Sequence, residues 1–174
     1  MIGVDVSEAM LDEARRRDPT GDYRHIPVGD LGSARAERFD LIFSAFTFDN
    51  VAAPDVRKAL FTSFRAVLGP AGRIINVVSA PEIYVNEWRS FTTRDFPENA
   101  HARSGDLVRI VMLDVEDRRP VEDAFWTDRD YRELYAAAGL DVVATHRPLG
   151  RETDPFTWVS ESRVSPWAIY VLGG

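Results

Sequence analysis

Two acidic residues follow apolar segments that are typical of β-strands. Asp5 stands at the end of the run Ile2–Val6, and Asp30 follows the run Tyr23–Val28. A carboxylate in such a place can accept hydrogen bonds from a ligand, for Asp5 the hydroxyls of a ribose and for Asp30 the amino group of an adenine. Either residue can instead cap the helix after it, Asp5 together with Ser7, and for Asp30 alone the cap is the commoner role.

A third apolar segment, Phe39–Phe46, is nearly continuous and ends in Ser44, Ala45 and Phe46. Such a run is typical of a strand that is covered on both faces. Small residues at its end let a ligand approach the backbone, and close packing is the alternative interpretation. Because parallel α/β sheets bind ligands at the carboxyl ends of their strands, we expect the ends of these three segments to form one site.

The pattern predicts helices and strands in short alternation. The helices are expected at Glu8–Arg17, Val56–Leu68 and Asp128–Ala138. The strands are expected at Ile2–Val6, Tyr23–Val28, Phe39–Phe46, Arg73–Val78, Leu107–Val115, Val121–Trp126, Leu140–Ala144 and Trp167–Leu172. This order predicts an α/β fold, a Rossmann-like and mostly parallel sheet with helices on both faces. We expect a β-hairpin insertion after the fourth strand, an antiparallel edge pair formed by the last two strands, and one domain over residues 1–174.

Composition excludes several classes of protein. The chain has 174 residues, 45% of them hydrophobic, which is enough for a packed core and argues against disorder. It has no cysteine, so disulfide scaffolds, thiol nucleophiles and thiolate metal sites are excluded. The net charge of −7 argues against nucleic-acid binding. We find no membrane span and no signal peptide, and no group of side chains with metal-ligand spacing, so we expect a cytoplasmic protein without a metal site.

Several of these segments together resemble class I S-adenosylmethionine-dependent methyltransferases. Gly3–Leu11 with Ala14-Arg15 is similar to the second-strand segment of that family, and Gly29-Asp30 to its next acidic motif. Phe39–Phe46 resembles its fourth strand. The unit Arg65–Ile75, with its Leu-x-Pro-x-Gly turn, resembles the helix, turn and fifth strand, and Tyr131–Val143 the last helix and sixth strand. The resemblance covers about residues 1–80 and 127–174.

The resemblance implies that S-adenosylmethionine is the cofactor. Asp5 would then bind the ribose hydroxyls, with Val6 and Met10 packed near the adenine or ribose. Asp30 would meet the adenine amino group, with Gly29 and Leu31 beside it. Ser44, Ala45 and Phe46 would line the methionine end near the sulfonium.

The same resemblance implies a departure at the amino end. The family's first strand, glycine-rich loop and first helix would precede Ile2, so we expect an N-terminally truncated domain. The absent strand lies, in the family, between the strands that end in Asp5 and Phe46. Three alternatives follow: Met1 is not the true start, a second chain fills the gap in a homo-oligomer, or the flanking strands close up and cofactor binding changes.

The segment from about 80 to 126 is variable in that family and usually covers the substrate. Tyr84 and Trp88 could present aromatic faces to a substrate, or the segment could be an ordinary packed connection. Phe48 is a further candidate for substrate contact. His101 is a candidate for a general base, although most lone histidines are structural or lie on the surface.

The function implied by the resemblance is methyl transfer to an N, O or C atom of a small molecule. Nucleic acid and membrane are not expected partners, and no catalytic residue can be assigned. One alternative is a non-catalytic methyltransferase-like partner or regulatory subunit. A nicotinamide-dependent oxidoreductase would use Asp5 in the same way, but the chain has no Tyr-x-x-x-Lys motif, and Lys58 is its one lysine.

Overall fold

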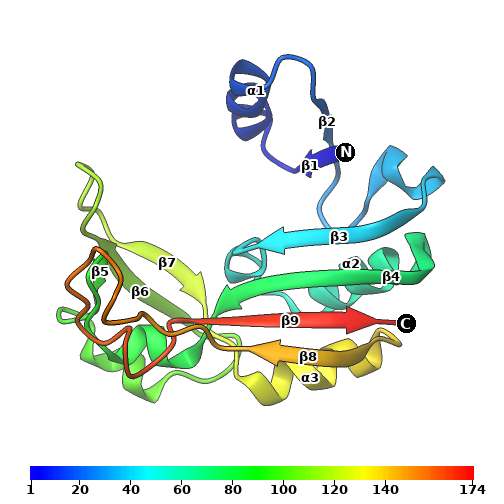
Figure 1. Cartoon of the computed structure of the whole chain (residues 1–174). Coiled ribbons are helices and arrows are strands. Elements are labelled where there is room, and N and C mark those ends of the chain that lie inside the picture. Colours follow the sequence, from blue (N-terminus) through cyan, green and yellow to red (C-terminus); the bar gives the residue numbers. More distant parts are fainter.

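The computed structural model describes residues 1–174 (Figure 1). The helices are α1 (Glu8–Arg17), α2 (Pro54–Val67) and α3 (Asp128–Ala137). The strands are β1 (Ile2–Asp5), β2 (Asp22–His25), β3 (Phe39–Ala45), β4 (Leu68–Ser79), β5 (Phe91–Thr92), β6 (Leu107–Met112), β7 (Val121–Ala124), β8 (Asp141–His146) and β9 (Trp167–Gly173). Four short 3-10 helices are η1 (Gly32–Ala36), η2 (Phe48–Asn50), η3 (Pro81–Val85) and η4 (Pro97–His101). Every predicted helix and strand is present, and β5 is additional. The longest helix, α2, has 14 residues, and no helix is long and apolar enough to span a membrane.

The strands form three sheets. The largest has the order β3-β4-β9-β8, and the other two are the pair β1-β2 and the sheet β5-β6-β7. β3 and β4 run parallel, as do β1 and β2, whereas β9 is antiparallel to both β4 and β8. The antiparallel edge pair is therefore confirmed, but the expectation of a mostly parallel sheet is wrong. No helix lies between β8 and β9, and without such a crossover the chain returns in the opposite direction.

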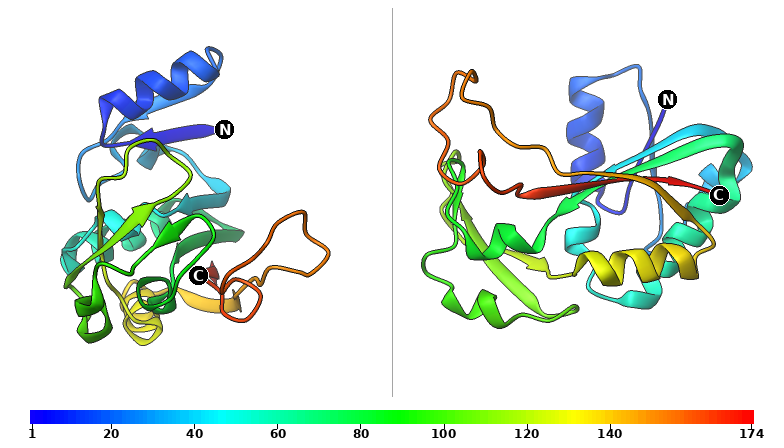
Figure 2. Two further views of the ribbon diagram at one scale, coloured as in Figure 1. Left: turned by 90° about the vertical axis from the view of Figure 1, so that its left-hand side faces the viewer. Right: turned by 60° about the horizontal axis from the view of Figure 1, so that its bottom comes forward.

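Helices α2 and α3 lie on the same face of the four-stranded sheet (Figures 1 and 2). Ile74, Val78 and Leu172 point into this layer and are completely buried or nearly so. The opposite face has no helix over it, and Phe43 is 65% exposed there. The expectation of helices on both faces is thus wrong for this sheet, because the third helix, α1, packs against β1 and β2 instead.

The β1-β2 pair shares no hydrogen-bonded ladder with the four-stranded sheet. In Figure 1 it lies beyond β3, and the chain between them runs through Pro27–Arg38. The alternative in which the strands ending at Asp5 and Phe46 close up against each other is therefore wrong for this structure. The other two alternatives stay predictions.

Residues 80–126 fold into a unit with a core of its own. The strands predicted on either side of Asp117–Pro120 pair as the antiparallel hairpin β6-β7. The buried residues of this second core are Ile83, Tyr84, Trp88, Phe91, Val108, Ile110 and Phe125. The unit lies beyond the carboxyl ends of β3 and β4 (Figure 1).

Aromatic rings join α2 to η2 and to α3. Phe61 is completely buried, its ring stacks on Phe48 with 4.4 Å between centroids, and it meets Tyr135 edge-on at 4.9 Å. We expect Phe61→Ala to lower the free energy of unfolding by about 3–5 kcal/mol, because it opens a cavity that the surrounding rings cannot fill. Urea denaturation measures this loss. The exposed residue Leu149 provides the control, since Leu149→Ala should change stability by less than about 0.5 kcal/mol. Equal losses in the two variants would contradict the assigned core.

Candidate functional site

The sequence left two roles open for Asp5, ligand binding and capping of α1 together with Ser7, and in the structure Ser7 alone caps the helix. The Ser7 hydroxyl accepts a hydrogen bond from the Met10 amide at 3.4 Å and caps α1. The Ser7 amide donates to Oδ1 of Asp5 at 2.8 Å, which fixes the carboxylate at the end of β1. Oδ2 of Asp5 accepts no hydrogen bond within the chain, and the residue is half-buried. One oxygen is thus held in place and the other is unpaired.

Asp30 has the same arrangement after β2. Its Oδ1 accepts a hydrogen bond from the amide of Gly32, the first residue of η1, at 3.0 Å. Nε of Arg35 lies 2.7 Å from the same oxygen. The preceding turn needs Gly29, whose φ of 78° most side chains disfavour. Asp30 therefore holds the turn before η1, but the N-cap of η1 is Leu31, so Asp30 is not the helix cap; its Oδ2 accepts no hydrogen bond.

Apolar side chains around these two carboxylates differ in exposure. Val6 and Met10, which flank Ser7, are exposed, Met10 by 60%. Leu31 is only 4% exposed and belongs to the main core. Its side chain packs into the main core and anchors the loop there. It therefore has no free face for the expected contact with an adenine ring in this structure.

The end of β3 places its three candidate residues differently. Ser44 is buried on the side of the helices, and its hydroxyl has no hydrogen-bond partner, whereas Ala45 is exposed. Phe46 has φ of 58°, an uncommon backbone conformation for a bulky residue. Its amide donates to the Val77 carbonyl at 2.9 Å, and its ring lies edge-on to Trp167 at 5.8 Å. A residue held in a strained conformation at the carboxyl end of a strand is a frequent mark of a functional site.

Asp49, which the sequence analysis did not select, lies just beyond Phe46 on η2. It is 4% exposed, and its Oδ2 accepts hydrogen bonds from the amide and the hydroxyl of Ser79, at 3.1 and 2.8 Å. Burial and the charge of nearby Asp123 outweigh the hydrogen bonds from Ser79 and together raise the pKa of Asp49 to about 7. The signal in the sequence was an acidic residue in the aromatic segment Phe46-Thr47-Phe48-Asp49, directly after the apolar strand.

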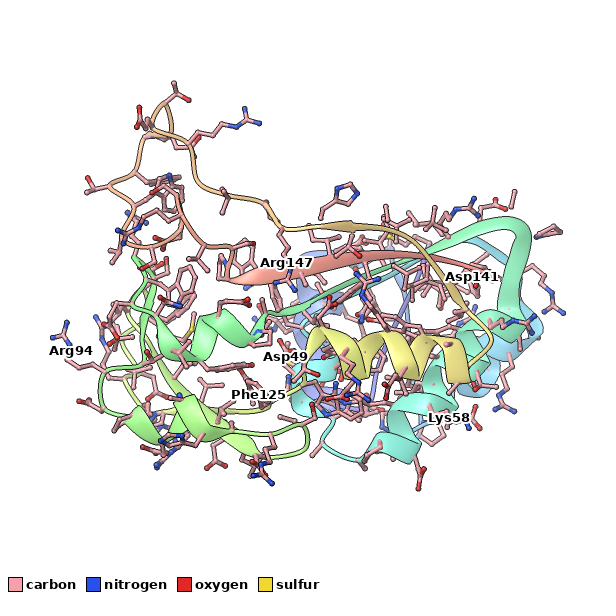
Figure 3. All side chains as sticks on the ribbon, turned by 90° about the horizontal axis from the view of Figure 1, so that it is seen from below. Asp49, Lys58, Arg94, Phe125, Asp141 and Arg147 are labelled. Carbon is pink, nitrogen blue, oxygen red and sulfur yellow. The ribbon has the colours of Figure 1, made fainter.

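Asp123 on β7 is the second buried carboxyl group at this junction. It accepts a hydrogen bond from the Tyr84 hydroxyl at 3.1 Å, and burial raises its pKa. Burial and the two nearby carboxylates raise the pKa of Tyr84 as well. Figure 3 shows Asp49 between the four-stranded sheet and the unit that contains Phe125. The ends of β3 and β4 are thus joined to residues 80–126 by a buried polar cluster.

Arg57 of α2 connects this junction to α3 from within the core. It is completely buried, its Nη1 donates to the Tyr131 hydroxyl at 2.8 Å, and Nε donates to the Val51 carbonyl. Its guanidinium lies 4.2 Å above the ring of Trp126. These contacts hold the loop after η2 against α3.

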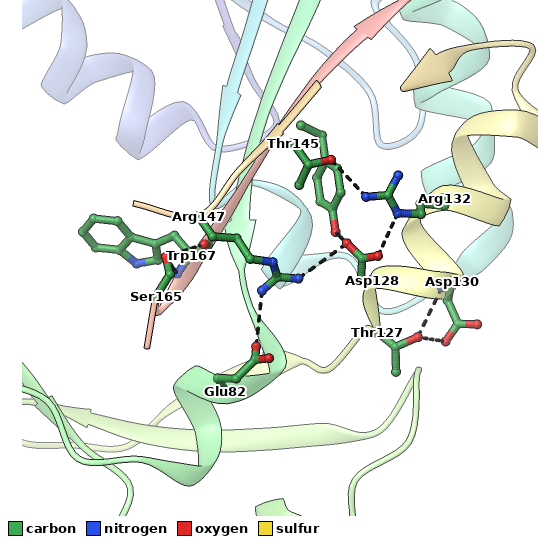
Figure 4. Close-up of polar contacts among 10 residues, drawn as sticks. Glu82, Thr127, Asp128, Asp130, Arg132, Thr145, Arg147, Ser165 and Trp167 are labelled. Atoms are coloured by element: carbon green, nitrogen blue, oxygen red, sulfur yellow. Dashed lines mark hydrogen bonds and ion pairs between the residues drawn. The ribbon is translucent and has the colours of Figure 1, made fainter. Parts of the chain in front are cut away.

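A second polar network, at the start of α3, lies nearer the surface and joins α3 to η3 and β9 (Figure 4). Asp128 accepts a hydrogen bond from the Tyr170 hydroxyl at 2.6 Å and one from Arg132 at 2.7 Å. Arg147 lies between Asp128 and Glu82 of η3, 3.5 and 3.4 Å from their carboxylates. Burial alone would raise the pKa of Asp128, but the bonds from Tyr170 and Arg132 outweigh it, so its pKa is lowered.

The four residues proposed for substrate contact do not gather on one open surface. Phe48 is in the main core, and Tyr84 and Trp88 are in the second core. The indole N–H of Trp88 donates to the Ile83 carbonyl at 2.8 Å. Residues 80–96 are accordingly the packed connection, not a lid with free aromatic faces. His101 is exposed at the end of η4, beside a cavity of about 350 Å³ that Glu98, Asn99 and Asp106 also line.

Comparison with known proteins identifies the fold. Residues 1–72 match a family described as a methyltransferase domain. An S-adenosylmethionine-dependent methyltransferase from Clostridium acetobutylicum is 14% identical, with a TM-score of 0.66 over 99% of this chain and 75% of that chain. The CcbJ methyltransferase from Streptomyces caelestis is 15% identical, with a TM-score of 0.64 over 98% and 78%. The glycopeptide N-methyltransferase MtfA, complexed with S-adenosylmethionine, is 14% identical, with a TM-score of 0.65 over 99% and 71%. No curated protein matches the sequence significantly.

The raised pKa of Asp49 predicts a pH dependence of stability. The folded protein keeps a proton on Asp49 up to about pH 7, whereas the unfolded chain loses it near 3.8, so stability falls as the pH rises through this window. Asp49→Asn stays uncharged, and between about pH 5 and 8 it should lose less stability than the wild type, by on the order of 2 kcal/mol. Denaturation curves at several pH values measure this. The exposed Asp141→Asn is the control, and parallel curves for wild type and Asp49→Asn would contradict the assignment.

The conformation of Phe46 predicts an inverted preference between glycine and alanine. Phe46→Gly should be more stable than Phe46→Ala by about 1 kcal/mol, because both lose the ring and only glycine relieves the positive φ. At the exposed Val143 in β8 the order should be the opposite, with alanine the more stable replacement. Thermal denaturation of the four variants tests both statements. The same order at both positions would show that Phe46 is not strained.

Proposed function

We propose, from the class I S-adenosylmethionine-dependent methyltransferase fold of this chain and the methyltransferase-domain match of residues 1–72, that it transfers a methyl group to a small molecule. The acceptor atom is a nitrogen, oxygen or carbon. S-adenosylmethionine supplies an activated methyl group, so the chain has to bind, orient and exclude water. The acidic net charge of −7 supports a small molecule over nucleic acid as the acceptor.

The observation that carries this proposal is that the carboxylates of Asp5 and Asp30 are held by the same kind of hydrogen bond. Asp5 and Asp30 follow neighbouring parallel strands, and each has Oδ1 held by the amide two residues further on. Each has Oδ2 unpaired and is half-buried. Two fixed acceptors at the carboxyl ends of adjacent strands suit the two donor groups of one nucleoside, the ribose hydroxyls and the adenine amino group.

The remaining residues have roles that follow from this placement. Oδ2 of Asp5 accepts from the ribose, and exposed Val6 and Met10 cover its apolar side. Asp30 accepts from the adenine amino group, and Gly29 lets the chain turn there. The methionine end lies toward Ala45 and Phe46, and the exposed ring of Phe46 shields the sulfonium from water. Ser44 contributes through its backbone, because its side chain points into the helix layer.

The acceptor would enter between Phe46 and the unit formed by residues 80–126. This unit stands over the carboxyl ends of β3 and β4 (Figure 1). The Asp49 bonds to Ser79 hold η2 against β4, so that the wall of the acceptor site does not move with the ligand. A second buried carboxyl group, Asp123, joins the same wall through Tyr84.

A non-catalytic partner or regulatory subunit is the second candidate function. It is favoured by the exposed Leu41 and Phe43 on the uncovered face of the sheet, and by the separation of β1-β2 from β3. A homo-oligomer in which a second chain occupies the space between β1 and β3 is compatible with either function. Light scattering on the purified chain, with and without ligand, distinguishes monomer from oligomer.

Isothermal titration with S-adenosylhomocysteine, the product of methyl transfer, tests the proposed function. We expect saturable binding, and we expect Asp5→Ala and Asp30→Asn each to weaken it about tenfold or more, because each removes a charged acceptor from a nucleoside donor. The control is Asp22→Asn, at the amino end of β2, which should leave binding unchanged.

The same titration separates the alternatives. A folded chain that does not bind S-adenosylhomocysteine contradicts the methyltransferase proposal and favours the non-catalytic one. Binding of a nicotinamide dinucleotide in its place, lost in Asp5→Ala, would favour an oxidoreductase.

A further inference from the structure

Arg35, on the short helix η1, joins Asp30 to the main body of the protein. We propose that Arg35 is a positioning residue that aims the Asp30 carboxylate at the base and makes the site select adenine. This inference rests on the proposed function, in which Asp30 receives the adenine amino group.

One hydrogen bond and one ion pair involve the Asp30 carboxylate, and both are made by the same oxygen. The Gly32 amide lies 3.0 Å from Oδ1, and Nε of Arg35 lies 2.7 Å from it. A carboxylate held by one amide can still rotate about its Cβ–Cγ bond, and the positive charge of Arg35 beside the same oxygen favours one orientation. Oδ2 is consequently the oxygen that remains, in a defined direction, for a ligand.

Arg35 also reaches across to helix α2. Its Nη2 donates to the hydroxyl of Ser63 at 3.3 Å, and Ser63 is buried. Two neighbours of Arg35 on the same loop, Leu31 and Ala34, are in the main core. The guanidinium therefore connects a half-buried carboxylate to a residue that the core holds rigidly.

This connection matters because β1-β2 shares no ladder with the four-stranded sheet. The nucleoside would lie on the β1-β2 side, whereas Phe46 and the acceptor wall belong to the four-stranded sheet. Arg35 helps to join the two sides through its ion pair with Asp30 and its hydrogen bond to Ser63. Its loss should loosen the base end of the site without unfolding the protein, since Arg35 itself is largely exposed.

The fixed carboxylate explains how the base would be selected. An ionised carboxylate is only an acceptor, so Oδ2 favours the 6-amino group of adenine. Hypoxanthine has an oxygen at that position, which would face the carboxylate oxygen without a proton between them. Discrimination of this kind depends on the carboxylate being unable to turn away.

The test compares two ligands, S-adenosylhomocysteine and S-inosylhomocysteine, which differ at position 6 of the base. The wild type should bind the adenosyl compound more tightly by about tenfold or more. Arg35→Ala should weaken adenosyl binding about five- to tenfold, because the hydrogen bond from the adenine amino group to Asp30 is no longer well aligned. Inosyl binding should be unchanged or slightly improved, because that ligand does not form this bond. Ser63→Ala should act in the same direction with a smaller effect.

Arg38 supplies the matched control. It lies three residues further along, and Arg35, Ser63 and Arg38 line one cavity of about 320 Å³. The hydrogen bond of Arg38, however, goes to the carbonyl of neighbouring Glu37. Arg38→Ala should leave both affinities and their ratio at wild-type values. Circular dichroism and thermal denaturation establish that every variant is folded.

Three results would overturn the inference. If Arg35→Ala weakens both ligands equally, Arg35 supports the loop in general and does not aim Asp30. If it changes neither affinity while Asp30→Asn abolishes the discrimination, Asp30 is positioned by the Gly32 amide alone and the proposed function stands. If the folded wild type binds neither compound, the proposed function fails and this inference fails with it.

Discussion

Burial of one face of the four-stranded sheet by α2 and α3 is the constraint on which the rest of the structure depends. The layer between them contains a continuous group of aromatic rings that includes Phe48, Phe61, Tyr131, Tyr135 and Tyr170. Rings of this size bury much apolar area and limit how the helices can lie. The hydroxyls of the three tyrosines are hydrogen-bonded to Asn76, Arg57 and Asp128.

The loops of the candidate site are anchored in that same layer. Phe48 enters the core immediately after the strained Phe46, and Leu31 and Ala34 enter it immediately after Asp30. Each loop thus has a buried apolar anchor within a few residues of the polar group that it presents. A loop held in this way keeps its functional side chain in place even where its backbone forms no ladder.

The second core, formed by residues 80–126, is joined to the first through polar groups. Asp49 and Asp123 are buried at the junction, with Ser79 and Tyr84 as their partners, and Arg147 links Glu82 to Asp128 nearer the surface. Polar bonds depend on direction more than apolar packing does, so they set the orientation of this unit over the ends of β3 and β4. Burial raises the pKa of both carboxyl groups at this junction.

Local patterns in the sequence determined the secondary structure and the positions of Asp5, Asp30 and Phe46 at the ends of strands. Caps, periodicity and turns act over three or four residues, so they can be identified without the fold; Ser7, for example, caps α1 as expected. Only the tertiary structure decided that α2 and α3 share one face, that β9 runs antiparallel to β4, and that Leu31, Phe48, Tyr84 and Trp88 are buried. It also decided that Asp49 is hydrogen-bonded to Ser79 and lies near Asp123. These results depend on contacts between residues far apart in the chain, and an apolar or acidic residue has the same local pattern whether it meets a ligand or the protein core.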